Sequence, residues 1–137
     1  MRRVYLDSNV FISLIDREIG KGSRGLFVEA EQFLERVKES GGILVLSKLF
    51  FAEIYHHNLM SRESVLGYLE GQGVKIETLP SETKFLLDKA ILAELHYADA
   101  LHAAVALASK CDCIVTFNIK DFEKVKARIA VFEPAEF

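Results

Sequence analysis

Four carboxylates in this chain stand directly beside short apolar or alanine-rich runs, where acidic side chains are unusual. They are Asp7 in VYLDSNVFI, Glu53 in LFFAEIYHH, Asp99 in YADALHAAVAL and Asp121 in VTFNIKDF. Acidic residues normally lie on solvated surfaces, and charge repulsion opposes their clustering unless a cation neutralises them. Because hard divalent cations take oxygen ligands, the four acids predict a Mg²⁺ or Mn²⁺ site assembled from distant parts of the sequence.

Each acid also has a simpler explanation, which the sequence leaves open. Asp7 follows an apolar run, so capping of the next helix would explain it. Asp99 and Asp121 fall in the first turns of expected helices, where negative charge is favoured. Glu53 lies in the middle of an expected helix, where no cap accounts for it. A salt bridge to a lysine or arginine elsewhere is its alternative explanation.

The rest of the sequence predicts the elements that would position these acids. Short strands are expected at 1–6, 43–46, 74–79, 113–116 and 129–132, helices at 8–16, 26–40, 47–59, 61–71, 80–95 and 98–109, a helical turn at 119–125 and a surface loop at 19–25. Alternating strands and helices predict an α/β layered fold with a mostly parallel sheet, in a single domain over 1–137. Functional groups gather beyond the carboxyl ends of parallel strands, which is where Asp7 would lie.

The helix expected at 98–109 is rich in alanine. One apolar face is predicted to consist of Ala98, Leu101, Val105 and Ala108. The remaining small side chains should let the helix approach the sheet closely and hold Asp99 near the strand ends; they are Ala100, Ala103, Ala104 and Ala106.

Composition limits the class of protein. The net charge is −3, from 17 basic and 20 acidic residues, which argues against a protein that coats nucleic acid non-specifically. Removing the four proposed ligands leaves 16 acids against 17 bases, so a nuclease whose metal contacts phosphate stays compatible with this charge. No apolar run is long enough to span a bilayer, no signal peptide is evident, and the spacing of Cys111 and Cys113 suits neither a disulfide nor a zinc site. We therefore expect a cytoplasmic protein.

The histidines and basic residues give weaker signals. No HExxH pattern occurs and the adjacent His56 and His57 point in different directions on a helix, so no zinc site is expected. His102 follows Asp99 by one helical turn, which leaves open a role in supporting the metal ligands or contacting the substrate, but we expect it at the surface. Phe50, Phe51 and Tyr55 are expected in the core. The basic side chains near the proposed site could contact RNA phosphates or simply lie on a solvated face of the protein. They are Lys120, Lys124, Lys126 and Arg128.

The segments DSNVFI, FFAEI, YADALHAA and VTFNIKDF, in this order and spacing, resemble those of PIN-domain ribonucleases, most of all the VapC-type toxins of prokaryotic toxin–antitoxin pairs. The resemblance covers nearly the whole chain. It implies an α/β/α sandwich with metal-dependent endoribonuclease activity on RNA, an antitoxin partner and a homodimer. The implied metal-binding and catalytic residues are Asp7, Glu53, Asp99 and Asp121, and the residues that orient ligands or waters are Ser8, Asn9, Thr116 and Asn118. We expect Asp7 and Asp99 to bind the ion directly and the other two acids partly through water.

One departure from the family pattern supports an alternative. Many relatives carry an acid where this chain has Asn118, so a non-catalytic PIN-like module that binds RNA or protein is the second hypothesis. A phosphatase working through a phospho-aspartate at Asp7 is disfavoured. Enzymes of that kind place a second aspartate two residues later, where this chain has Asn9.

Overall fold

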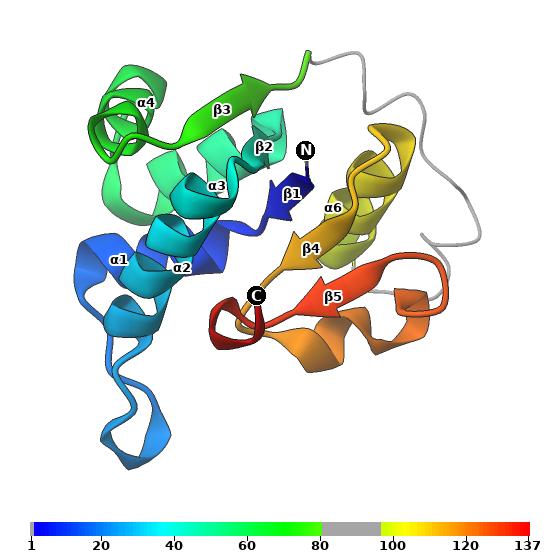
Figure 1. The fold of residues 1–137 in the computed structure, drawn as a ribbon, viewed down its shortest axis with the longest axis horizontal. Helices are drawn as coiled ribbons and strands as arrows, with labels where there is room; N and C mark the ends of the chain where they lie inside the picture. The colour runs from blue at the N-terminus through cyan, green and yellow to red at the C-terminus, as the bar shows by residue number, and fades with distance from the viewer. Residues whose placement is uncertain (1, 81–96) are drawn as a thin grey trace.

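The computed structural model of the chain describes residues 2–80 and 97–137, and its centre is a five-stranded sheet (Figure 1). The strands are β1 (Arg3–Leu6), β2 (Ile43–Leu46), β3 (Lys75–Thr78), β4 (Cys113–Val115) and β5 (Ala130–Phe132). Their spatial order is β3-β2-β1-β4-β5, and each neighbouring pair is parallel. The predicted α/β fold with a mostly parallel sheet is confirmed.

Helices connect the strands close to the predicted positions. They are α1 (Ser8–Asp16), α2 (Leu26–Ser40), α3 (Lys48–Asn58), α4 (Arg62–Gly71) and α6 (Tyr97–Ala108), with short 3₁₀ helices η1 (Lys21–Ser23), η3 (Ile119–Val125) and η4 (Pro134–Glu136). The helix predicted at 80–95 lies, beyond its first residue, outside the described part of the chain. Within residues 2–80 and 97–137, no helix is both long and apolar enough to cross a bilayer.

Two local signals set the bounds of the helices around the site. The buried stripe of α2 repeats every three or four residues, and the helix ends at Gly41, whose φ of 72° suits a residue without a side chain. Helix α3 begins after Ser47, whose Oγ accepts a hydrogen bond from the backbone N–H of Phe50 at 3.1 Å. The cap fixes the direction in which α3 leaves β2, and therefore where its later residues lie.

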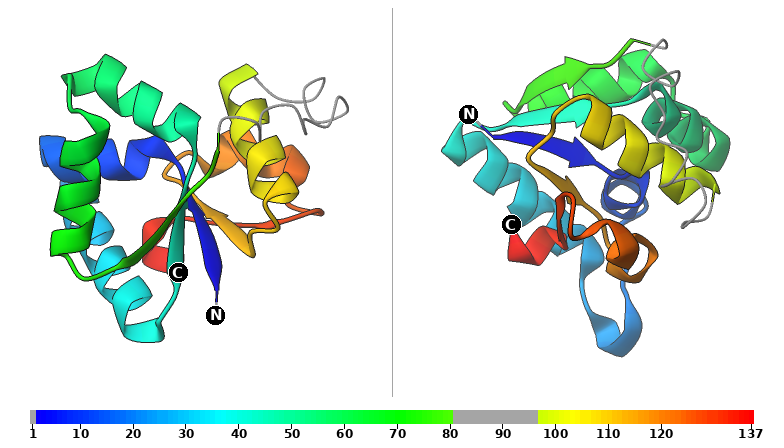
Figure 2. Two further views of the ribbon diagram at one scale, coloured as in Figure 1. Left: turned by 90° about the horizontal axis from the view of Figure 1, so that it is seen from above. Right: turned by 90° about the vertical axis from the view of Figure 1, so that its right-hand side faces the viewer.

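Helices cover both faces of the sheet. Alternate side chains of β1 point to opposite faces, so Val4 and Leu6 enter the core formed with α1, α2, α3 and α4, whereas Tyr5 enters the core formed with α6 and η3. Figure 2 shows α6 and η3 on one side of the sheet and the first four helices on the other, where η4 packs against α2. The expected α/β/α sandwich is confirmed.

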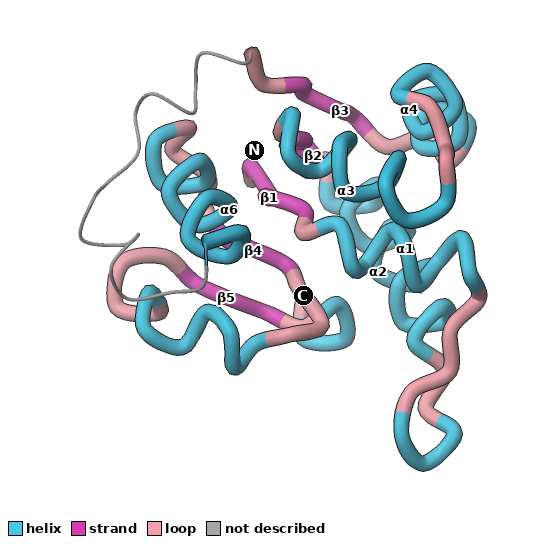
Figure 3. The backbone as a smooth tube through the Cα atoms, turned by 180° about the vertical axis from the view of Figure 1, so that it is seen from behind, coloured by secondary structure: helices cyan, strands magenta, loops and turns pink. Residues whose placement is uncertain are grey.

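Helix α6 lies against β4 (Figure 3) and packs through its alanines. The small side chains predicted to allow a close approach are all 0–2 % exposed; they are Ala100, Ala103, Ala104 and Ala106. The predicted apolar face was wrong in part, because Ala98, Leu101 and Ala108 are only half-buried. The buried alanine face of α6 meets the sheet, because methyl side chains allow the helix backbone to lie closer to the strands.

The strand order reverses between β1 and β4. The chain moves from β1 outward to β2 and β3, and then returns to the other side of β1 to form β4 and β5. Leu6 and Val115 are paired in register, so the residues that follow both strands emerge side by side. Such a switch point is where open parallel sheets bind ligands, because the loops on its two sides diverge to opposite faces.

Candidate metal centre

Asp7 and Thr116 occupy the switch point directly. The backbone N–H of Asp7 donates to the carbonyl of Val115 at 3.1 Å, and the hydroxyl of Thr116 donates to Oδ2 of Asp7 at 2.8 Å. Asp7 stands at the N-cap position of α1, but its side chain makes no capping hydrogen bond. Capping therefore does not explain this carboxylate. The Asn9 side chain supports the arrangement by donating to Thr116 Oγ1 at 3.1 Å.

Helix α3 brings Glu53 to the same place. Because β2 is the neighbour of β1, the helix that follows it starts beside the end of β1. Ser8 Oγ donates to Glu53 Oε1 at 2.9 Å, and His102 Nε2 lies 2.6 Å from the same oxygen. Among the described residues, the partner of Glu53 is therefore the imidazole of His102 and not the lysine or arginine considered from the sequence.

His102 is buried, with a side chain only 2 % exposed, although the sequence predicted a surface position. The close packing of α6 explains the difference, since its alanines flank His102 and turn it inward with them. Its Nε2 also lies 3.6 Å from Asp7 Oδ1. The imidazole thus stands between two carboxylates that come from different elements.

A chain of buried hydroxyls holds the other side of this ring. His102 Nδ1 and the Tyr5 hydroxyl share a hydrogen bond of 2.5 Å, and the Tyr5 hydroxyl shares another of 2.8 Å with Ser47 Oγ. This role of Tyr5 and Ser47 was not predicted from the sequence. The available signal was a tyrosine inside the otherwise aliphatic first strand, because a buried hydroxyl needs a polar partner.

Burial and proximity change the protonation of these groups. Burial raises the pKa of Asp7, although His102 and the Thr116 hydroxyl act against the shift. Burial would lower the pKa of His102, but the hydrogen bond to Glu53 and the charges of Asp7, Glu53 and Asp99 together raise it. Burial would raise the pKa of Glu53, but its hydrogen bonds with His102 and Ser8 lower it overall. The metal-free site therefore favours a proton on the imidazole beside an ionised Glu53.

Comparisons with known proteins identify the family and the fold of the chain. The sequence matches the PIN domain family over residues 4–128. The chain belongs to the PIN domain family. Its fold is similar to that of a chain in the crystal structure of VapBC2 from Rickettsia felis bound to a DNA fragment from their promoter, with a TM-score of 0.55 and 18% identity over 96% of this chain and 97% of that chain. A comparison with curated proteins finds no match.

The other predicted residues of this PIN domain are distributed around the switch point. Asp99 lies half-buried in the first turn of α6, one turn before His102, and its charge acts on that imidazole. Asp121 is exposed in the first turn of η3, and the exposed Asn118 donates its backbone N–H to Thr116 Oγ1. Within the described parts of the chain, the closely spaced ligand atoms at the switch point belong to Asp7, Glu53 and His102, without Asp99 or Asp121.

The donor set at the switch point fits a divalent cation. One ligand atom each from Asp7, Glu53 and His102 lies within 4.8 Å of the other two. Two carboxylates and one imidazole are ligand types that protein metal sites use. Each of the three is oriented by a further hydrogen bond, from Thr116, Ser8 and Tyr5 respectively, which is typical of metal ligands.

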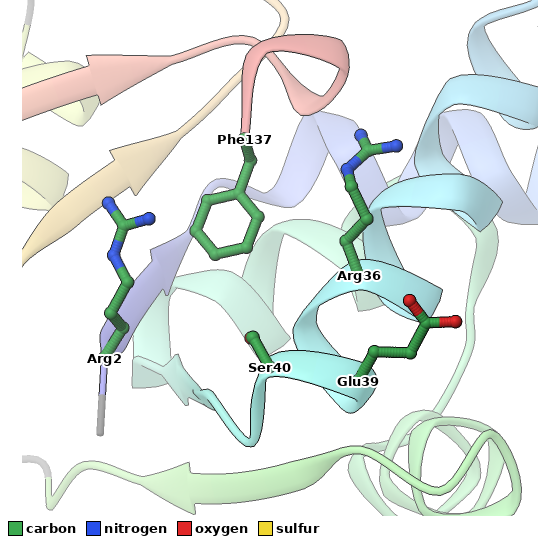
Figure 4. A pocket seen from close by; sticks show the side chains of 5 residues that line it. All are labelled: Arg2, Arg36, Glu39, Ser40 and Phe137. Carbon is green, nitrogen blue, oxygen red and sulfur yellow. The ribbon is translucent and has the colours of Figure 1, made fainter.

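Two further features of the surface are distinct from this centre. A second group of ligand types, Asp16, Glu18 and His57, lies where α1 and α3 end, and is exposed or half-exposed. A cavity of about 410 Å³ is lined by Arg2, Arg36, Glu39, Ser40 and Phe137 (Figure 4). Arg2 precedes β1 whereas Asp7 follows it, so this cavity lies at the opposite end of the strand.

Proposed function

We propose that this PIN domain is an endoribonuclease that hydrolyses RNA phosphodiester bonds at the Asp7 site with Mg²⁺ or Mn²⁺ as cofactor. The observation that carries the proposal is the convergence of Asp7 and Glu53, from β1 and α3, on the switch point of a PIN fold. The buried Asp7 and the half-buried Glu53 repel one another unless a positive charge lies between them, and a divalent ion would supply more of it than a proton on His102 does. A metal-dependent nuclease uses such a cation to neutralise the negative charge of its phosphodiester substrate.

The residues have distinct roles in this proposal. Asp7 and Glu53 hold the ion, while Asp99 and Asp121 act at its edge through bound water; the roles of Glu53 and Asp99 are thus exchanged relative to the expectation from the sequence, because the atoms of Glu53 are the ones grouped with those of Asp7. Ser8, Asn9, Thr116 and Asn118 keep the carboxylates and the substrate-side waters oriented. When bound, the divalent ion supplies a water of lowered pKa and neutralises charge on the phosphate. The exposed Lys120 and Lys124 flank Asp121 on η3, and we assign them to RNA phosphate contacts.

The biological setting belongs to the same proposal. Similarity of fold to a chain of the VapBC2 complex supports a VapC-like toxin that an antitoxin protein holds inactive. A homodimer and a cytoplasmic location go with that assignment. Size-exclusion chromatography with light scattering tests the dimer directly, and a mass equal to that of the monomer at micromolar concentration would contradict it.

The decisive experiment is RNA cleavage by the purified chain with Mg²⁺, Mn²⁺ or EDTA. We expect metal-dependent cleavage that Asp7→Asn and Glu53→Gln both abolish. Asp16→Asn is the matched control, because it makes the same chemical change in an exposed acid away from the site. Cleavage that survives Asp7→Asn would show a contaminating nuclease and overturn the proposal. Absence of both RNA cleavage and Mn²⁺ binding would favour the non-catalytic alternative.

A further inference from the structure

His102 is aimed at the place where the proposed metal ion would bind. Its Nε2 lies 2.6 Å from Glu53 Oε1 and 3.6 Å from Asp7 Oδ1, so the ring nitrogen and the two carboxylate oxygens face one another. A proton lies between Nε2 and the Glu53 oxygen in this arrangement, because two lone pairs do not approach so closely. A metal ion bound among the three would take the place of that proton, as ligands bind metals in their deprotonated forms.

The hydrogen bond on the other ring nitrogen suits a metal-binding histidine. When Nδ1 carries its hydrogen, it donates to the Tyr5 oxygen, and the Tyr5 hydroxyl then donates to Ser47 Oγ. Once the proton on Nε2 has been displaced, this nitrogen offers a lone pair directed at the two carboxylates. Histidines that bind metals commonly have such a partner on the second nitrogen, which fixes the tautomer and the ring orientation.

Packing keeps the ring in this position. His102 is 2 % exposed, and its ring meets that of Tyr5 edge-on, with centroids 5.5 Å apart and planes at 68°. The buried alanines on both sides of His102 leave α6 close to the sheet. Rotation of the imidazole away from Asp7 and Glu53 would break both of its hydrogen bonds within the core, which is costly.

We infer that His102 binds the metal ion through Nε2, together with Asp7 and Glu53, and that this PIN domain therefore selects a first-row transition ion over Mg²⁺. The inference rests on the proposed metal site and concerns which ion that site takes. Carboxylate and water oxygens suit Mg²⁺, whereas imidazole nitrogen favours transition ions, in the order of affinity that rises from Mn²⁺. Asp99, one turn before His102 on α6, adds negative charge near the ring without replacing the nitrogen ligand.

The test is pulsed electron paramagnetic resonance of Mn²⁺ added to metal-free protein. In the wild type we expect the ¹⁴N modulation of a coordinated imidazole. Labelling of the protein with [¹⁵N]histidine should replace it with ¹⁵N modulation. His102→Gln should bind Mn²⁺ without this modulation, and its ratio of Mn²⁺ to Mg²⁺ affinity should fall by about tenfold or more. Tyr5→Phe keeps the nitrogen ligand but frees the ring, so the modulation should persist while Mn²⁺ affinity falls about tenfold.

The controls separate this inference from the nuclease proposal. His57→Gln, in the exposed cluster, should leave both the modulation and the affinity ratio unchanged. Bound Mn²⁺ that Asp7→Asn releases but that shows no nitrogen modulation would overturn the role of His102, while metal-dependent RNA cleavage would still stand. Modulation lost in His57→Gln and kept in His102→Gln would also overturn it. Failure of the wild type to bind Mn²⁺ at all would overturn the proposed function itself.

Discussion

Two groups of side chains in this protein contain the same ligand types but differ in their surroundings. They are Asp7 with Glu53 and His102, and Asp16 with Glu18 and His57. In both, a histidine Nε2 lies 2.6 Å from a carboxylate oxygen. His102 is 2 % exposed, whereas His57 is 46 % exposed. The first group lies at the switch point of the sheet, and the second lies where two helices end in solvent.

The difference between the two groups is the support around their ligands. Around His102, three hydroxyls from Thr116, Ser8 and Tyr5 orient the two acids and the ring. In the exposed group, the Ser13 hydroxyl contacts Glu18 at 3.1 Å, and Asp16 stands in the last turn of α1, where a negative charge is unfavourable. Similar residue types thus make a strong candidate site only where burial and oriented partners hold them.

The largest expected difference is in stability without metal. His102→Ala removes the positive charge between the buried Asp7 and the half-buried Glu53, so it should lower the free energy of unfolding by about 3 kcal/mol, the low end for a buried ion pair. His57→Ala breaks an exposed pair and should lower the same free energy by less than about 1 kcal/mol. Urea unfolding in EDTA measures both values. Equal losses would show that burial does not separate the two groups.

The second largest difference between the two groups should be in the stabilisation of the fold by Mn²⁺. At a Mn²⁺ concentration of about 100 times the dissociation constant, the wild type should gain about 2.7 kcal/mol in its free energy of unfolding. Asp7→Asn should lose this gain, and Asp16→Asn should keep it. Thermal unfolding with and without Mn²⁺ provides the measurement, and a gain abolished by Asp16→Asn would place the ion in the exposed group.

The supporting hydroxyl of Tyr5 should have a smaller effect. Tyr5→Phe leaves His102 Nδ1 without a partner inside the core, so we expect a loss of about 1–2 kcal/mol in the free energy of unfolding. Tyr55→Phe is the matched control, because Tyr55 is 57 % exposed and the loss should stay below about 0.5 kcal/mol. If Tyr5→Phe leaves the free energy of unfolding unchanged, the hydrogen bonds of Tyr5 to His102 and Ser47 do not stabilise the site.

The smallest effect is the pH dependence of the metal-free protein. The pKa of His102 is raised in the folded state from its ordinary 6.5, so the folded protein holds this proton more tightly than the unfolded chain does. Its contribution to stability is therefore complete below the ordinary value and is lost as the pH rises through the folded pKa. In EDTA, the difference between wild type and His102→Gln should be larger at about pH 6 than at about pH 9. A difference that grows with pH would contradict the raised pKa.

Much of the fold could be predicted from local patterns. The stripe of α2, the stop at Gly41 and the cap at Ser47 each depend on neighbouring residues alone, and all three are found in the structure. Two sequence signals pointed to a shared site: Asp7 follows a buried strand, and Glu53 lies among aromatic residues. The structure places these two acids on either side of His102. The expected core position of Tyr55 was wrong, since it lies on the outer side of α3 from Phe50 and Phe51.

Residue types and their periodicity determined the alternation of strands and helices, and the places where acids stand beside apolar runs. Only the tertiary structure decided which acids share a site and what neutralises them, because that depends on strand order and on the distance between α6 and the sheet. His102 shows the limit most clearly. A histidine on an alanine-rich helix is compatible with either the surface or the core, and the packing of α6 on β4 placed it between Asp7 and Glu53.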